Sequence, residues 1–237
     1  MKISHLLIIS VFIILVSYLG SLLLKPGGKM SIQDFETETF SGVNNKIGAN
    51  VYITPGDVQK IAVSANEKIM KDLSLEVKNG VLVIDKKKRT IRFDSISIKI
   101  SMKDLKNLKI EGSGNISTSG IFNTDRDVDL SIAGSGNIDA NINTKATVRT
   151  GIYGSGNIDL KGRSMKFESI IQGSGNVSAY DFHSAFATVN IDGSGNCEVS
   201  ADSTLNANIN GSGSIYYKGT PVVNTNINGS GDVQGSK

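Results

Sequence analysis

The sequence lacks tryptophan, and it contains one cysteine, Cys197, and only two histidines, His5 and His183. A single cysteine excludes a disulfide within the chain. Two isolated histidines give no support to a histidine-based catalytic triad or to a histidine-rich metal site. We therefore predict no catalytic residues, no metal site and no bound cofactor.

A strong charge of either sign is also missing, since 25 Lys and Arg residues against 22 Asp and Glu residues leave a net charge of +3. The one dense basic run, Lys86–Arg89, has no interleaved aromatic residues on which nucleic-acid bases could stack. We therefore expect no nucleic-acid partner. Proline is scarce, with 3 residues, whereas glycine is abundant, with 26. With many Asn, Ser, Ile and Val residues besides, this composition is typical of an all-β protein with many turns.

Long apolar runs are absent except for one near the start of the chain. Leu6 to Leu24 spans nineteen residues without a charge, which is long enough to cross a bilayer. No clear small-x-small cleavage site follows, and this favours an uncleaved signal anchor over a cleaved signal peptide. We expect residues 1–30 to be a signal anchor or signal peptide plus linker. The body is then anchored to the cytoplasmic membrane and lies outside the cytoplasm, or it is secreted or periplasmic if the segment is cleaved.

What the sequence has in quantity is a repeated phrase, Gly-Ser-Gly-Asn, which continues in altered form near the C-terminus. Successive phrases begin 18 to 22 residues apart. An isoleucine stands two residues before every phrase, and apolar and polar residues alternate ahead of it, as in a strand with one buried face. This period is that of a solenoid turn, whereas a propeller blade needs about 40 residues. Residues 105–237 therefore predict a parallel β-helix of about seven coils. The phrases begin at Gly112, Gly134, Gly154, Gly173, Gly193, Gly211 and Gly229.

The phrase itself is interpreted as a corner between two strands. Glycines on both sides of the serine allow positive φ, and the asparagine tolerates the left-handed region better than other residues do. A phosphate-binding loop is excluded, because such a loop occurs once between a strand and a helix. Cys197 follows the fifth phrase, where the other repeats have Ile or Val, so we interpret it as a small buried core residue.

Residues 31–104 are β-like but not repeated, and they predict an N-terminal β-rich lobe or cap. The strongest local signal is Asn79-Gly80 between two apolar runs, which is typical of a two-residue hairpin. A solenoid needs a cover over its terminal coil. We therefore expect this lobe to close the N-terminal end of the stack.

Stacked coils place like residues over like, so columns of asparagine are expected. One column would run along the corners, from Asn115 to Asn196. A second would lie on the outer face of the later coils. We interpret both as stabilising ladders, with the alternative that the outer column binds sugar hydroxyls. The candidate ligand-facing residues are Asn190, Asn208 and Asn226, with Asp192, Asn210 and Asn228 beside them.

Paired carboxylates would be required of a polysaccharide-active β-helix enzyme. Asp181, Asp192 and Glu198 lie on neighbouring coils, but nothing in the pattern marks two of them as an acid/base pair. We keep this enzyme as the least favoured alternative.

Several segments together resemble one protein family. Phe40–Val43, Asn50–Gly56, Ile61–Ala65 and Asn79–Ile84, followed by the repeated Gly-Ser-Gly-Asn-Ile, are similar to the "putative auto-transporter adhesin, head GIN domain" family of bacterial exported proteins. The resemblance covers most of the chain after about residue 35. It implies a β-helical, non-enzymatic, extracytoplasmic domain and offers no catalytic residues to transfer.

Two functions of different classes follow. The first is a membrane-tethered or secreted adhesin-like binding module for surface polymers such as glycans, or for surface proteins. The second is a structural element of the envelope that self-associates through its β-helix.

Overall fold

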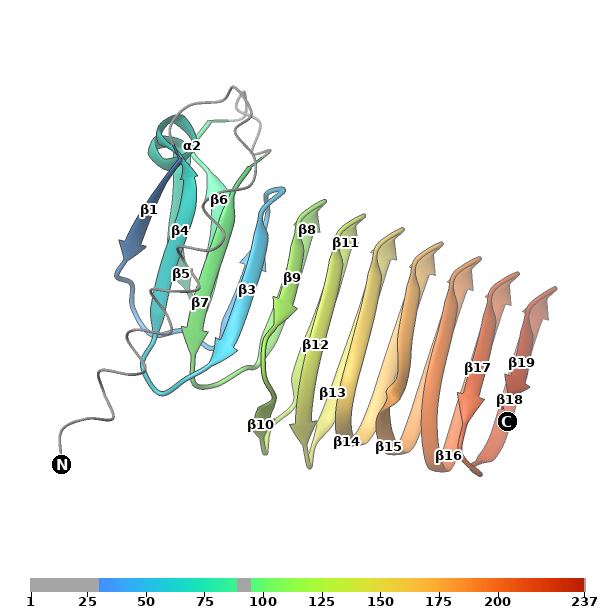
Figure 1. Cartoon of the computed structure of the whole chain (residues 1–237). Helices are drawn as coiled ribbons and strands as arrows, with labels where there is room; N and C mark the ends of the chain where they lie inside the picture. Colours follow the sequence, from blue (N-terminus) through green and yellow to red (C-terminus); the bar gives the residue numbers. More distant parts are fainter. Residues whose placement is uncertain (1–29, 89–94, 237) are drawn as a thin grey trace, which may run out of the picture.

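The computed structural model describes residues 30–88 and 95–236, and 72% of the chain is strand. Stacked parallel coils form a β-solenoid of about 6 turns between the seven corner phrases (Figure 1). The predicted fold class, an all-β parallel β-helix, is confirmed. No helix in the described ranges is long and apolar enough to cross a membrane. The predicted anchor from Leu6 to Leu24 lies outside those ranges.

Each coil consists of one strand before the corner, one strand after it, and a second corner that leads to the next coil. The first coils are built from short strands, and three later strands bend through the second corner without a break. The short strands are β8 (Asn107–Gly112), β9 (Asn115–Thr118), β10 (Phe122–Thr124), β11 (Val128–Gly134), β12 (Asn137–Thr144) and β13 (Thr147–Gly154). The long ones are β14 (Asn157–Gly173), β15 (Asn176–Gly193) and β16 (Asn196–Gly211), and the stack ends with β17 (Ser214–Lys218), β18 (Val222–Gly229) and β19 (Asp232–Gly235).

These strands present two outward surfaces. The leading face belongs to the strands that precede the corners: β8, β11, β13, the second halves of β14, β15 and β16, and β18. The trailing face belongs to the strands that follow them: β9, β12, the first halves of β14, β15 and β16, then β17 and β19.

The coils are in parallel register, so the isoleucines before the corners form one buried row. Ile132 pairs with Ile110 and Ile152, and Ile191 pairs with Ile171 and Ile209. These six side chains are at most 2% exposed and belong to a single hydrophobic cluster that runs from Phe40 to Ile215. Stacking of the coils shields this row of apolar side chains from water, which no single coil could do alone.

Cys197 occupies the expected place in this core. It lies in register between Val177 and Ile215 and has no exposed surface. Burial raises the pKa of its thiol to about 12, so the neutral thiol acts as a small apolar side chain.

Both glycines of the corner lie too close to the preceding coil to carry a Cβ, but only the first also has positive φ, and this corrects the expectation from sequence. The first has positive φ, as at Gly154 with φ 144°, while the second is not among the positive-φ residues. At Gly156 a Cβ would stand 2.3 Å from the carbonyl oxygen of Gly136 and 2.8 Å from Cγ2 of Ile132. The second glycine is therefore required by close stacking of coils.

The corner asparagines were also expected to use the left-handed region, and this is wrong. Among the described non-glycine residues only Asn79 has positive φ. Each corner asparagine instead begins the next strand, because extended backbone lets its side chain reach the adjacent coil.

The N-terminal lobe contains seven strands and one short helix. They are β1 (Met30–Phe35), β2 (Gly42–Asn45), β3 (Asn50–Pro55), β4 (Lys60–Asn66), α2 (Glu67–Asp72), β5 (Leu73–Lys78), β6 (Val81–Lys86) and β7 (Ser97–Met102). The predicted hairpin is confirmed: β5 and β6 are antiparallel, with φ of 53° at Asn79 and 74° at Gly80.

The lobe continues the stack directly. β2 pairs in parallel with β8, and β3 pairs in parallel with β9, while β1, β4 and β7 form an antiparallel layer (Figure 1). The division between a lobe of residues 31–104 and repeats of residues 105–237 stays a prediction, since the hydrogen-bonded sheet crosses it.

Candidate ligand-binding faces

An asparagine column runs along the corners and reaches into the lobe. Each amide Nδ2 donates to the Oδ1 of the asparagine one coil earlier, at 2.8 to 3.1 Å. The predicted column is therefore hydrogen-bonded, and it has one further member, Asn50 of β3. Sequence reasoning missed Asn50 because its segment lacks the glycine phrase. The column comprises Asn50, Asn115, Asn137, Asn157, Asn176 and Asn196.

The six predicted ligand-facing residues come together on the leading face of the last coils. Asn190, Asn208 and Asn226 occupy one row across β15, β16 and β18, and Asp192, Asn210 and Asn228 occupy the next row. Nδ2 of Asn208 donates to Oδ1 of Asn190 at 2.9 Å. In the second row, Asn210 donates to Asp192 at 3.1 Å and Asn228 donates to Asn210 at 3.2 Å. Their role as ligand contacts stays a prediction.

A third row completes this surface. Thr188, Asn206 and Asn224 are in register on the same three strands, and Asn224 donates to Asn206 at 3.0 Å. Sequence reasoning did not select this row, although the same alternation of outward positions contains it. We call the nine residues of these three rows the amide face.

The amide face retains hydrogen-bonding capacity toward solvent. An asparagine side chain has two N–H donors and two acceptor lone pairs. Asn210 uses one donor to Asp192 and accepts one bond from Asn228, so one N–H and one lone pair stay free. A stabilising ladder and a ligand surface are therefore compatible on the same residues.

Apolar side chains border the amide face on the preceding coils. Tyr153 is 49% exposed and belongs to the row that continues through Gln172 to Asp192. Ile170 is 41% exposed and pairs with Asn190. An exposed tyrosine ring followed in the same row by the Gln172 amide and then the Asp192 carboxylate is a combination that suits the apolar and hydroxyl-bearing faces of a sugar. Neither residue was predicted from sequence.

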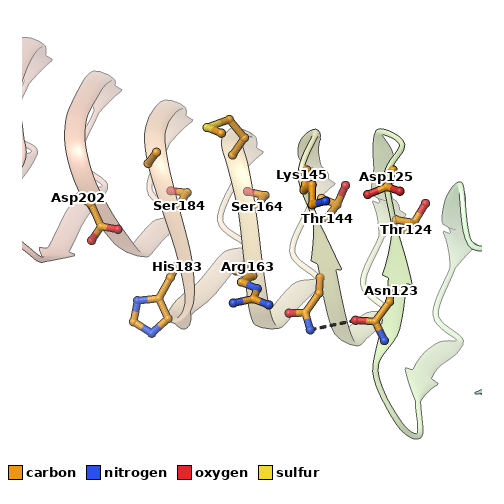
Figure 2. Close-up of a pocket in the computed structure, with 13 residues that line it drawn as sticks. Asn123, Thr124, Asp125, Thr144, Lys145, Arg163, Ser164, His183, Ser184 and Asp202 are labelled. Atoms are coloured by element: carbon orange, nitrogen blue, oxygen red, sulfur yellow. Dashed lines mark hydrogen bonds between the residues drawn. The ribbon is translucent and has the colours of Figure 1, made fainter.

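A groove of about 540 Å³ follows the second corners of five successive coils (Figure 2). One row of side chains crosses it in register, from Asn123 through Asn143 and Arg163 to His183. Lys145 lines the groove on the coil before Arg163, and Asp125 and Asp202 lie toward its two ends (Figure 2). Nδ2 of Asn143 donates to Oδ1 of Asn123 at 3.1 Å, and Nδ1 of His183 lies 3.2 Å from Oγ of Ser200.

The three carboxylates considered for catalysis do not form one site. Asp192 faces outward on the leading face, whereas Glu198 lies on the trailing face, where Ser178 donates to it at 2.6 Å. Asp181 and Glu198 both lie near Asp159, whose pKa is raised mainly by burial, with additional repulsion from Asp139, Asp181 and Glu198, so only Asp192 is apart from the other two. No group of three or more His, Cys, Asp or Glu residues within the described ranges is arranged to hold a metal ion.

Comparison with known proteins agrees with this architecture. The profile of the family "putative auto-transporter adhesin, head GIN domain" matches residues 39–221. The chain belongs to this family. The head GIN domain thus begins just before β2 and ends just after β17. It includes the groove and most of the amide face. A search of curated proteins finds no match.

Several solved structures share the fold of this head GIN domain chain. A putative adhesin from Bacteroides fragilis is 22% identical with a TM-score of 0.83, and the match covers 90% of this chain and 100% of the other. A putative lipid binding protein from Parabacteroides distasonis is 27% identical with a TM-score of 0.74, covering 89% and 98%. A putative adhesin from Parabacteroides merdae is 21% identical with a TM-score of 0.67, again covering 89% and 98%.

Proposed function

We propose that the chain is an extracytoplasmic, non-enzymatic, adhesin-like module that binds surface polymers, and that the amide face with Tyr153 is its binding surface. The family and several similar structures carry the adhesin name, which supports the class of function. The observation that carries the proposal is the set of aligned amides that keep a free donor and a free acceptor each, with an exposed ring two coils earlier in the row of Asp192.

Export is part of the proposal. The uncharged run from Leu6 to Leu24 would tether the chain to the membrane or direct its secretion. In either case the β-helix would stand outside the cytoplasm, where glycans and surface proteins are available as partners.

A glycan array probed with the full chain in mild detergent tests the binding surface. The variant Asn190→Ala, Asn208→Ala, Asn226→Ala removes the middle row of the amide face, and Tyr153→Ala removes the ring. We expect both to weaken binding of the selected glycan about tenfold or more, because sites that hydrogen-bond hydroxyls lose affinity when those partners are deleted.

The matched control changes the corner column instead. Asn137→Ala, Asn157→Ala, Asn176→Ala deletes the same number of amides from a hydrogen-bonded ladder that lies away from the leading face. It should lower thermal stability while glycan affinity is retained. A face variant that loses stability but binds like the parent would show that the amide face is only structural.

Two further measurements bound the proposal. Incubation of the selected polymer with the chain, followed by assay of new reducing ends and unsaturated sugars, should show no cleavage; turnover would identify an enzyme.

Vesicles of phosphatidylcholine and phosphatidylglycerol serve as a parallel probe, because one similar structure is named a lipid binding protein. Binding to vesicles without binding to glycans or surface proteins would contradict the proposal.

A structural envelope element is the second candidate, and the last coil supports it. β18 pairs only with β16, and β19 only with β17, within the described ranges. Val222 and Ile227 on β18 are 68% and 41% exposed. Open strand edges of this kind can pair with another chain. Concentration-dependent assembly in sedimentation experiments would favour this function, and a monomer that binds glycans would favour the first.

A further inference from the structure

The groove at the second corners contains two cations, Lys145 and Arg163, for which residues 30–88 and 95–236 supply no acidic partner. Lys145 and Arg163 both line the groove, and neither forms an ion pair within 4 Å among the described residues. On the leading face, by contrast, Arg149 contacts Asp127, Asp129 and Glu168 at 2.8, 3.4 and 3.1 Å. The fold therefore neutralises its leading-face arginine but leaves the groove's charge available for a ligand.

The neighbours of Arg163 provide polar groups on both sides of it. Successive coils lie about 4.8 Å apart, so the row presents one side chain at roughly that interval. Asn143 precedes Arg163 and is held by Asn123 at 3.1 Å. His183 follows Arg163 in the row, and its Nδ1 lies 3.2 Å from Oγ of Ser200, so Nε2 is the ring nitrogen left for a ligand. A guanidinium between an amide and an imidazole can bind one carboxylate and the hydroxyls beside it.

Acidic side chains limit how much negative charge the groove accepts. Asp125 and Asp202 belong to the first and last coils that line it, with Lys145 and Arg163 between them (Figure 2). An anion at the centre lies between the coil of Lys145 and the coil of Arg163, while anions at the ends would lie beside carboxylates. Carboxylates at the ends accept hydrogen bonds from hydroxyl groups, which suits neutral sugars there.

We propose that this groove binds a short polysaccharide segment in which one uronic acid, held by Arg163 and Lys145, is flanked by neutral sugars. The volume of about 540 Å³ falls in the range of sites for small molecules. The inference rests on the proposed function only for the class of ligand, a surface polymer. The groove and the amide face are separate surfaces, so each can be removed while the other is kept.

The test uses calorimetric titration of the full chain with defined tetrasaccharides. The main probe has a single glucuronate between neutral hexoses. The comparison probes are the same molecule with its carboxyl reduced, a tetragalacturonate, and inorganic phosphate. We expect the single-glucuronate probe to bind about tenfold or more tightly than either the reduced or the fully acidic one, and phosphate not to compete at millimolar concentration.

Variants then assign the binding to the groove. Lys145→Gln with Arg163→Gln should weaken binding of the single-glucuronate probe about tenfold or more. The control Arg126→Gln with Lys161→Gln also removes one arginine charge and one lysine charge, but from side chains that do not line the groove. It should change affinity less than about twofold. Asp125→Asn with Asp202→Asn should raise the affinity for tetragalacturonate, because it removes the repulsion at the ends.

Four results would overturn the inference: no measurable binding of the glucuronate probe, equal binding of the reduced probe, tighter binding of tetragalacturonate, or phosphate competition at the same site. Binding that survives the groove variant but is lost in the Asn190, Asn208, Asn226 variant would place the sugar on the amide face, so the proposed function would stand without the groove. The reverse pattern would support the groove and contradict the amide face.

Discussion

At the residue scale, the second glycine of each phrase sets the distance between coils. The Cβ that any other residue would add at Gly156 falls 2.3 Å from a carbonyl oxygen, and the equivalent distance at Gly175 is 2.2 Å and at Gly195 is 2.1 Å. The obstacle is backbone of the preceding coil, which cannot move aside as a flexible side chain could. The repetition of glycine at this position therefore follows from stacking geometry.

Replacement of Gly156 by alanine should accordingly destabilise the chain. We expect a loss of about 2–4 kcal/mol in the free energy of unfolding, because the new methyl group forces two coils apart in a closely packed stack. Urea denaturation followed by circular dichroism measures this loss.

The neighbouring serine provides the control for that substitution. Ser155 is exposed, and its contact with the previous coil is made by its backbone N–H, which donates to Gly134 O at 2.9 Å. Ser155→Ala should therefore change the free energy of unfolding by no more than about 0.5 kcal/mol. Equal effects of the two alanines would contradict the stacking role of Gly156.

The buried row of isoleucines could be predicted because buried strand positions are apolar and alternate with polar outward positions in the sequence. The roles of the corner residues could be predicted only in part. Glycine is consistent with positive φ and with close approach of a neighbour; both causes apply at Gly154, whereas only close approach applies at Gly156. Asparagine is likewise consistent with a left-handed turn and with a hydrogen-bonded column, and only the folded structure distinguishes the two.

At the scale of elements, Glu111 joins the lobe to the first coil. Its carboxylate on β8 accepts from Lys109 at 2.7 Å and from Asn44 of the lobe at 3.1 Å, and it lies 3.3 Å from Lys46 Nζ. Hydrogen bonding from Lys109, followed by that from Asn44 and Lys46, lowers the pKa of Glu111 to about 2 despite its partial burial. The ionised form is therefore the one that the folded state favours.

Glu111→Gln should lower stability in a pH-dependent way. A carboxyl whose pKa is lower in the folded state stabilises fully above its unfolded pKa, here about 4.5, and that stabilisation is lost as pH falls toward about 2. We expect a loss of about 1 kcal/mol at pH 7, a value reduced for screening because the side chain is 32% exposed. Parent and variant should converge when unfolding is measured near pH 2.

A control for Glu111→Gln is available on helix α2. Glu67 pairs with Lys71 at 2.6 Å, but the two side chains are 80% and 76% exposed. Glu67→Gln should change the unfolding curves little at any pH, because exposed pairs contribute little to stability. A Glu111→Gln variant that differed from its parent by the same amount at pH 7 and at pH 2 would contradict the assigned role.

The two candidate surfaces differ in how far they could be predicted. The six selected residues of the amide face follow from strict alternation on strands of constant register, and the structure aligns them as expected. The groove could not be found in this way. The register shifts between Asp159 and Gly162 and again between Ala179 and His183, just before the groove residues of those coils, so a fixed offset from the glycine phrase no longer means equal position there.

At the scale of the whole molecule, the solenoid is held together by contacts between adjacent coils. An isoleucine in a central coil packs between the preceding coil and the following coil. The isoleucine of the last described coil packs against the preceding coil only. The exposed fraction of the row shows this directly, since it is 2% at Ile191 and at Ile209 but 41% at Ile227. In such an array stability is close to a sum of coil and interface contributions.

Hydrogen exchange and a pair of truncations should therefore reveal a gradient along the stack. Amides of β18 and β19 should exchange at least about tenfold faster than those of β13 and the second half of β14, because the last coil can open without disrupting the rest. Ile191→Ala should lower the free energy of unfolding by about 2–5 kcal/mol, as for a buried large-to-small change, and Ile227→Ala by about 1 kcal/mol or less. If exchange were uniform along the stack and the two alanines equally costly, the coils would unfold as one cooperative unit.

If β18 exchanged as slowly as β13 only at high protein concentration, a second copy would be covering the last coil, and the structural candidate would gain support over the monomeric binding module.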